Sequence, residues 1–137
     1  MRRVFVDSGG WYAHLVAEDA DHATSRRLFQ QARAERWSLF TTNAVVFEAY
    51  ALILNRAREG RALALTMLED LEAGFANVER VTRRDEVRAA ALVRAQIDKS
   101  YSLCDALSFV VMERLRISDA IAFDRHFRQY GRFTLLE

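Results

Sequence analysis

Short apolar runs alternate with longer helical segments along the whole chain, and this alternation limits the folds that the chain can adopt. Runs such as RVFV are rich in β-branched and aromatic residues, whereas the segments between them repeat apolar residues with a helical period. The pattern predicts strands at 3–6, 37–42, 77–81, 119–123 and 132–136, and helices at 8–19, 20–36, 44–60, 61–74, 84–98, 106–116 and 125–131. Strands separated by helices pair in parallel, so we expect a three-layer α/β/α sandwich with a central parallel sheet of four to five strands.

Composition is typical of one globular domain. The 137 residues are 51% hydrophobic and 28% charged, with no proline and only 5 glycines, so no linker divides them. We therefore expect a single domain over residues 1–137.

Charge and cysteine content narrow the class of protein further. The formal net charge is only +1, from 20 basic and 19 acidic residues, so composition alone does not indicate a nucleic-acid-binding protein. Cys104 is the only cysteine, which excludes an intrachain disulfide and a cysteine-based metal site and fits a reducing compartment. The first apolar run is too short for a signal peptide, and Glu48 interrupts the longest one. We expect a cytoplasmic protein without membrane contact.

Two aspartates directly follow predicted strands. Asp7 comes after VFV and Asp124 comes after AIAF, at the carboxyl ends where sites lie in parallel sheets. The simpler interpretation of Asp7 is an N-cap of the next helix, and taken alone it is the favoured one. Asp119 stands at the start of its strand, so we expect it at the opposite edge of the sheet, as a turn residue.

Two further acids lie in apolar helices. Glu48 lies in a helix that Asn43 would cap and Gly60 would end. It shares one helical face with Ala44, Ala51 and Asn55. This face is either exposed to solvent or the floor of a cleft. Asp105 stands three residues after Ser102, as in a capping box, but it also opens a very apolar helix, where a buried carboxylate would sit.

The four acids together predict a chemistry that none predicts alone. Four clustered carboxylates repel one another and cannot all stay ionised without cations. Oxygen ligands favour Mg²⁺ or Mn²⁺ over zinc. Such ions can activate water and stabilise the leaving oxygen of a phosphodiester, which points to phosphoryl chemistry.

Other catalytic motifs are missing. No phosphate-binding loop or HExxH motif is present, and Gly9-Gly10 is a weak signal that also leaves room beside Asp7. Ser8 has no evident histidine partner, so a hydrolase triad is not expected, although its hydroxyl could contact a metal or its waters. The histidines are isolated, and His126 alone lies close enough in sequence to Asp124 to suggest substrate contact.

Four stretches in order resemble the PIN-domain ribonucleases, in particular VapC-type toxins: VFVDSGGWYA, TTNAVVFEAYALI, YSLCDALSFVVME and AIAFDRHFRQYG. The resemblance covers essentially the whole chain and maps the metal-binding acids of that family onto Asp7, Glu48, Asp105 and Asp124. It implies a PIN-like fold, Mg²⁺- or Mn²⁺-dependent endoribonuclease activity, inhibition by a cognate antitoxin and a homodimer.

Three positions depart from the family pattern. Ala122, Cys104 and Gly9 stand where hydroxyl or amide side chains are usual, so the second metal ion has less support than the first.

Our hypothesis is a toxin-type ribonuclease that acts on RNA. Asp7, Glu48 and Asp105 would hold a principal ion, Asp124 would bind there or at a second ion, and Ser8, Arg125 and His126 would contact substrate. Two alternatives stay open: an inactive PIN module that only binds RNA or protein, and an aspartate-based phosphoacceptor or phosphatase domain.

Overall fold

The computed structural model describes all residues, 1–137, and contains one five-stranded sheet. The strands are β1 (Arg3–Val6), β2 (Ser38–Thr42), β3 (Asn77–Glu79), β4 (Asp119–Ile121) and β5 (Thr134–Leu135). Their order is β3-β2-β1-β4-β5, and every neighbouring pair is parallel. The parallel sheet predicted from the sequence is confirmed.

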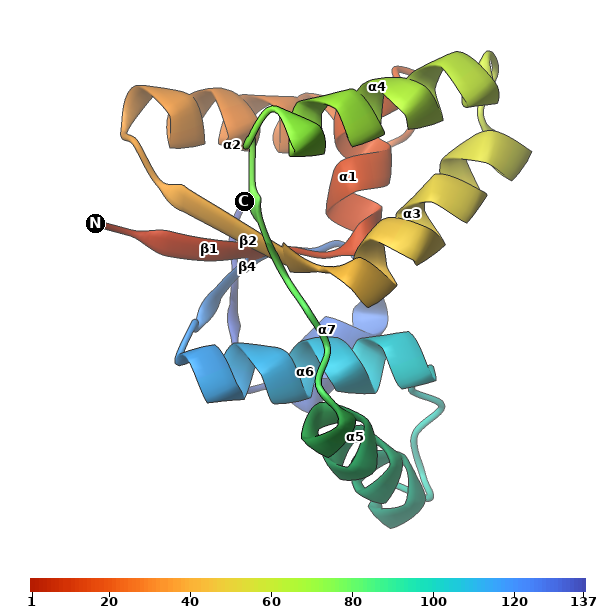
Figure 1. The fold of residues 1–137 in the computed structure, drawn as a ribbon, viewed down its shortest axis with the longest axis vertical. Coiled ribbons are helices and arrows are strands. Elements are labelled where there is room, and N and C mark those ends of the chain that lie inside the picture. Colours follow the sequence, from red (N-terminus) through yellow and green to blue (C-terminus); the bar gives the residue numbers. More distant parts are fainter.

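Seven helices cover the two faces of this sheet (Figure 1). They are α1 (Ser8–Leu15), α2 (His22–Ala34), α3 (Asn43–Arg56), α4 (Gly60–Glu72), α5 (Arg83–Ala95), α6 (Leu103–Leu115) and α7 (Arg125–Tyr130). Helices α1 to α4 lie on one face and α5 to α7 on the other, which gives the predicted three layers. None of these helices combines the length and apolar character needed to cross a membrane.

The central strand β1 is where the strand order changes direction. The chain passes from β1 outward to β2 and β3, and later returns to β4 on the other side of β1. Val4 pairs with Leu39 on one side, and Phe5 pairs with Ala120 on the other. In open parallel sheets a crevice forms at such a reversal, beyond the carboxyl ends of the two strands. Asp7 and Asp124 are therefore delivered to one crevice.

Helix α6 is buried along most of its length because helix α5 covers its outer side. Every residue from Asp105 to Met112 is buried, and Phe109 packs edge-on against Phe127 of α7. An ion pair fastens this layer, since Arg114 of α6 donates two hydrogen bonds to Asp85 of α5, at 2.9 and 2.8 Å. The apolar character of α6 is thus explained by its place between α5 and the sheet.

Several predicted helix boundaries were wrong, among them the end of α1, the start of α3 and the connection of α3 to α4. Helix α1 ends at Leu15, four residues before the predicted end. Thr42 caps α3, accepting a hydrogen bond from the Val45 amide, whereas Asn43 is helical and accepts from the Val81 amide near β3. Gly60 opens α4 instead of ending α3: a Cβ there would collide with the carbonyl groups of the last turns of α3, so glycine permits the tight connection.

Gly10 allows α1 to approach β4 closely, and its replacement should destabilise the fold. A Cβ on Gly10 would lie 2.6 Å from the Ile121 carbonyl oxygen, whereas a Cβ on Gly9 meets nothing closer than 3.9 Å. We expect Gly10→Ala to lower the free energy of unfolding by about 1–3 kcal/mol, as overpacking usually does. Gly9→Ala is the matched control and should be neutral or slightly stabilising, since alanine favours helices. Urea denaturation of both variants measures the difference; equal effects would contradict the close-packing argument.

Candidate active site

Asp7 leaves β1 at the crevice and is almost fully buried, with 2% of its surface exposed. Its backbone amide donates to the Ile121 carbonyl oxygen at 3.1 Å, which ties the end of β1 to β4. Asp7 occupies the N-cap position of α1, but the capping hydrogen bond expected from the sequence is absent. Its Oδ1 atom is buried without any hydrogen-bond partner. A buried carboxylate oxygen without a donor is costly, so this atom is available to a cation.

Glu48 reaches the crevice from α3, on the opposite side from the β4 end. The Ser8 hydroxyl at the start of α1 donates a short hydrogen bond of 2.5 Å to Glu48 Oε1, which fixes the carboxylate orientation. Cys104 lies in the same cluster: burial raises the pKa of its thiol, and the carboxylates of Glu48 and Asp7 raise it further. The thiol is therefore neutral beside these acids.

Asp105 combines the two roles that its sequence position suggested. It forms a capping box with Ser102, whose backbone amide donates to Asp105 Oδ2 at 3.0 Å. The same oxygen lies 2.7 Å from Nδ1 of His126. Because both donors use Oδ2, the other carboxylate oxygen is left for a cation.

Asp124 follows β4 and caps the short helix α7. Its Oδ1 accepts the backbone amide of His126 at 2.8 Å, and the Nδ1 atom of His126 lies 3.4 Å from the same oxygen. One ligand atom from each of Asp105, Asp124 and His126 can be chosen so that all three lie within 4.8 Å of one another. His126 is therefore not the isolated histidine that the sequence indicated, because α7 folds it back onto Asp105.

The electrostatics of the cluster favour a bound cation. Burial raises the pKa of Asp7 from 3.8 to about 8; the Ser8 amide opposes this, while Asp105, Glu48 and Asp124 raise it further. In the folded protein, burial and the neighbouring carboxylates thus disfavour the ionised form of Asp7. A divalent cation among these oxygens removes that conflict, so the residues present fit a hard metal ion.

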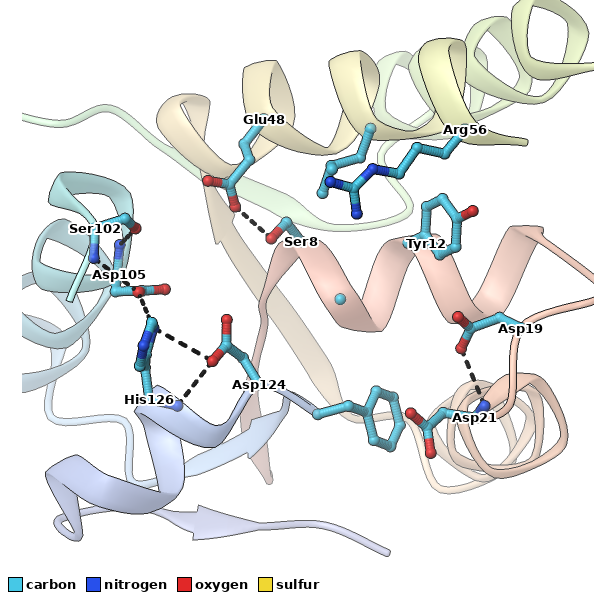
Figure 2. Close-up of a pocket in the computed structure, with 13 residues that line it drawn as sticks. Ser8, Tyr12, Asp19, Asp21, Glu48, Arg56, Ser102, Asp105, Asp124 and His126 are labelled. Carbon is cyan, nitrogen blue, oxygen red and sulfur yellow. Dashed lines mark hydrogen bonds and ion pairs between the residues drawn. The ribbon is translucent and has the colours of Figure 1, made fainter. Parts of the chain in front are cut away.

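Glu48, Asp105, Asp124 and His126 line a pocket of about 560 Å³, whereas the buried Asp7 is not among its lining residues (Figure 2). Its lining residues are Ser8, Gly9, Tyr12, Asp19, Asp21, Glu48, Leu52, Arg56, Ser102, Asp105, Phe123, Asp124 and His126. Figure 2 shows Glu48, Asp105, Asp124 and His126 gathered at one end, with Arg56 and Tyr12 further along between α3 and α1 and with Asp19 and Asp21 beyond Tyr12. The pocket thus has one end lined by carboxylates and His126, and another end that carries Arg56 together with two aspartates.

Of the three residues predicted to contact substrate, two lie at the pocket and one does not. Ser8 and His126 line the pocket, whereas Arg125 is exposed and does not. Gly9 lines the pocket, but Gly10 serves the packing of α1 on β4 and not the room beside Asp7.

The sequence prediction missed the residues at the far end of the pocket. The predicted face of α3 included Ala51 and Asn55, which are exposed, whereas the pocket is lined by Leu52 and Arg56. A signal existed, since Leu52 and Arg56 follow Glu48 at intervals of four residues, the spacing of one helix face.

Comparison with known proteins gives consistent matches over nearly the whole chain. A PIN-domain family model matches residues 4–133. The 23S rRNA-specific endonuclease VapC20 of Mycobacterium tuberculosis is 32% identical over 128 residues, which are 93% of this chain and 94% of that protein. The crystal structure of M. tuberculosis VapC20, described as a sarcin–ricin loop cleaving toxin, matches with a TM-score of 0.88 and 30% identity over 98% of this chain and 99% of that one.

A more distant structure shares the fold alone. VapBC2 from Rickettsia felis, bound to a DNA fragment of its promoter, matches with a TM-score of 0.67 at 8% identity, over 97% of this chain and 96% of that one.

The raised pKa of Asp7 predicts how stability depends on pH and metal. Unfolded Asp7 loses its proton near 3.8 and folded Asp7 only near 8, so the metal-free protein should lose stability as the pH rises between these values. Asp7→Asn should remove this loss and, in a chelator at pH 8, raise the Tm by on the order of 5 °C. Mn²⁺ should raise the Tm of the wild type but not of the variant. Thermal denaturation measures both effects, and an unchanged wild-type Tm with Mn²⁺ would contradict a metal site.

Proposed function

The chain belongs to the PIN-domain family, and from that premise we propose that it is a metal-dependent endoribonuclease of the VapC toxin type. One observation carries the proposal: the carboxylates of Asp7, Glu48, Asp105 and Asp124 come from four separate elements to one crevice, with an unpartnered Asp7 oxygen among them. Clustered, buried carboxylates destabilise the metal-free protein, and such clusters with perturbed pKa values are typical of functional sites.

Asp7, Glu48 and Asp105 would hold a principal ion, with Asp124 at the same ion or at a second one. We propose Mg²⁺ or Mn²⁺, because the donors are mainly carboxylate oxygens. When bound, such ions supply activation of the attacking water and stabilisation of the leaving oxygen of a phosphodiester.

The surrounding side chains keep these carboxylates in position. The Ser8 hydroxyl holds Glu48, while the Ser102 amide and His126 together hold Asp105. An ionised carboxylate only accepts hydrogen bonds, so in that state of Asp105 the Nδ1 atom of His126 would be the donor. His126 is therefore a positioning residue as well as a candidate for contact with RNA at the pocket.

For the substrate we propose an unpaired loop of ribosomal RNA. VapC20 is described as 23S rRNA-specific and as cleaving the sarcin–ricin loop, and its likeness to this chain spans nearly the full length of both. A single-stranded loop also presents splayed bases, which RNA-binding proteins read most readily.

As partners we propose a cognate antitoxin that blocks the pocket and a second copy of the chain. The antitoxin follows from the VapC type, and the dimer follows from the family resemblance. The cytoplasm, where ribosomes and a reduced Cys104 coexist, is the proposed compartment.

Asp7→Asn tests the ribonuclease directly. The purified wild type should cleave ribosomal RNA with Mg²⁺ or Mn²⁺ and lose this activity in EDTA. Asp7→Asn should reduce cleavage by about 100-fold or more, as loss of a group that stabilises transition-state charge usually does. Its expression should no longer arrest growth.

Asp119→Asn is the matched control for this experiment. Asp119 pairs with Arg2 at 2.9 Å at the opposite edge of the sheet, so the same chemical change there should leave cleavage intact. Metal binding without any cleavage by the wild type would favour the inactive module, and equal toxicity of Asp7→Asn and wild type would refute the mechanism.

The antitoxin proposal predicts a complex that neutralises the toxin. Co-expression with the product of the neighbouring gene should restore growth and should yield a stable complex without ribonuclease activity. Size-exclusion chromatography with light scattering would detect the complex and give the oligomeric state of the free chain. Co-expression that leaves both growth arrest and cleavage unchanged would contradict this partner.

A further inference from the structure

We propose that Arg56 and Tyr12 form an RNA-binding subsite in which Arg56 takes a backbone phosphate beyond the scissile one and Tyr12 stacks on an unpaired base. This inference rests on the proposed ribonuclease function and adds to it the path of the RNA strand. Three observations support it: the geometry of the pocket, the charge of its lining, and the absence of any ion pair or hydrogen bond at the Arg56 side chain.

Two helices build the pocket walls with the same periodicity. On α3, Leu52 and Arg56 follow Glu48 at intervals of four residues, and on α1, Tyr12 follows Ser8 by four. Side chains at this spacing share one helix face, so each wall runs from the carboxylates outward. With a rise of about 1.5 Å per residue, the backbone of Arg56 lies about 12 Å along α3 from that of Glu48. The subsite is therefore continuous with the acidic end and begins further along each helix.

Arg56 is the only arginine or lysine that lines this pocket. Figure 2 shows its side chain extending from α3 into the space between Tyr12 and Ser8. It makes no ion pair within 4 Å and no hydrogen bond, whereas Arg114 is fully engaged with Asp85 and Glu79. A guanidinium has five donors in a planar fork that matches a phosphate. An unengaged guanidinium inside an otherwise acidic pocket is therefore suited to an anionic ligand.

Two acids beyond Tyr12 restrict where the RNA backbone can lie. Asp19 and Asp21 line the pocket from the loop between α1 and α2, and Asp19 Oδ2 accepts the Asp21 backbone amide at 3.0 Å. Phosphates are repelled from these two carboxylates. The RNA backbone should therefore follow the α3 side of the pocket, where Arg56 lies.

Tyr12 and Phe123 supply the aromatic surface of the pocket. Both are half-buried and line it, and the Tyr12 hydroxyl makes no hydrogen bond. Aromatic rings bind unpaired bases by stacking with little sequence preference, at about 1–3 kcal/mol per base. Together with one phosphate contact, this surface favours a single-stranded segment over a helix.

The first test compares two arginines that differ in position only. Arg58 lies just outside the pocket and, like Arg56, is exposed and without an ion pair, so Arg58→Ala removes the same charge nearby. The probe is an RNA stem–loop carrying the site that the wild type cleaves. Arg56→Ala should raise KM by about tenfold with kcat nearly unchanged, because a contact to a distant phosphate contributes uniform binding. The slope of the logarithm of the binding constant against the logarithm of the salt concentration should fall by about 1, as expected for the loss of one phosphate contact. Arg58→Ala should change neither quantity.

A second test identifies the phosphate itself. Single methylphosphonate linkages are neutral, so placing one at each position of the loop in turn should reveal one position, away from the cleavage site, that raises KM in the wild type. The same substitution should have no effect on Arg56→Ala. Tyr12→Phe should keep the affinity for the probe, while Tyr12→Leu should lower it. Circular dichroism and melting curves would verify that all variants fold.

The outcomes separate this inference from the function on which it rests. Cleavage that depends on Asp7, together with equal KM values for Arg56→Ala and Arg58→Ala, would overturn the subsite alone. A methylphosphonate position that stays sensitive in Arg56→Ala would overturn the assigned phosphate contact. A wild-type chain that neither cleaves nor binds RNA would overturn both proposals.

Discussion

The repulsion among carboxylates gathered in one crevice is the constraint on which the rest of the structure depends. Asp7 is nearly fully buried, and burial raises its pKa to about 8, with Asp105, Glu48 and Asp124 adding to the shift. Such a cluster does not arise from good packing, because each carboxylate loses solvation and gains like-charged neighbours. The parallel sheet supplies what holds it together: the strand order reverses at β1, and the ends of β1 and β4 lie side by side.

Hydrogen bonds then orient the acids without neutralising them. Glu48 receives the Ser8 hydroxyl, and Asp105 receives the Ser102 amide and His126, but Asp7 Oδ1 receives nothing. Neutral or single donors fix direction and leave oxygens free, which is the arrangement that metal sites require of their supporting residues. The tightly packed, largely buried α6 gives this arrangement a rigid base. The site therefore trades stability of the metal-free protein for binding capacity.

Periodicity and residue order predicted the alternation of strands and helices, the parallel sheet and the edge at which the acids meet. They predicted helix ends less well: Thr42 caps α3 instead of Asn43, whose side chain accepts a hydrogen bond from the Val81 amide, a contact across 38 residues. They also missed His126 beside Asp105 and Arg56 in the pocket, since helix spacing gives a face but not the direction in which that face points.

The sequence by itself determined which groups are available: strands that end in acids, an apolar helix interrupted by Glu48, and a capping box at Asp105. Those features are local, and local backbone preferences are enough to specify them. Only the tertiary structure decided that Asp7 lacks a capping bond and that Arg56, unpaired, shares a pocket with Tyr12. Both facts depend on how α1 and α3 pack over the sheet, and packing between distant segments is not written in the spacing of residues along either one.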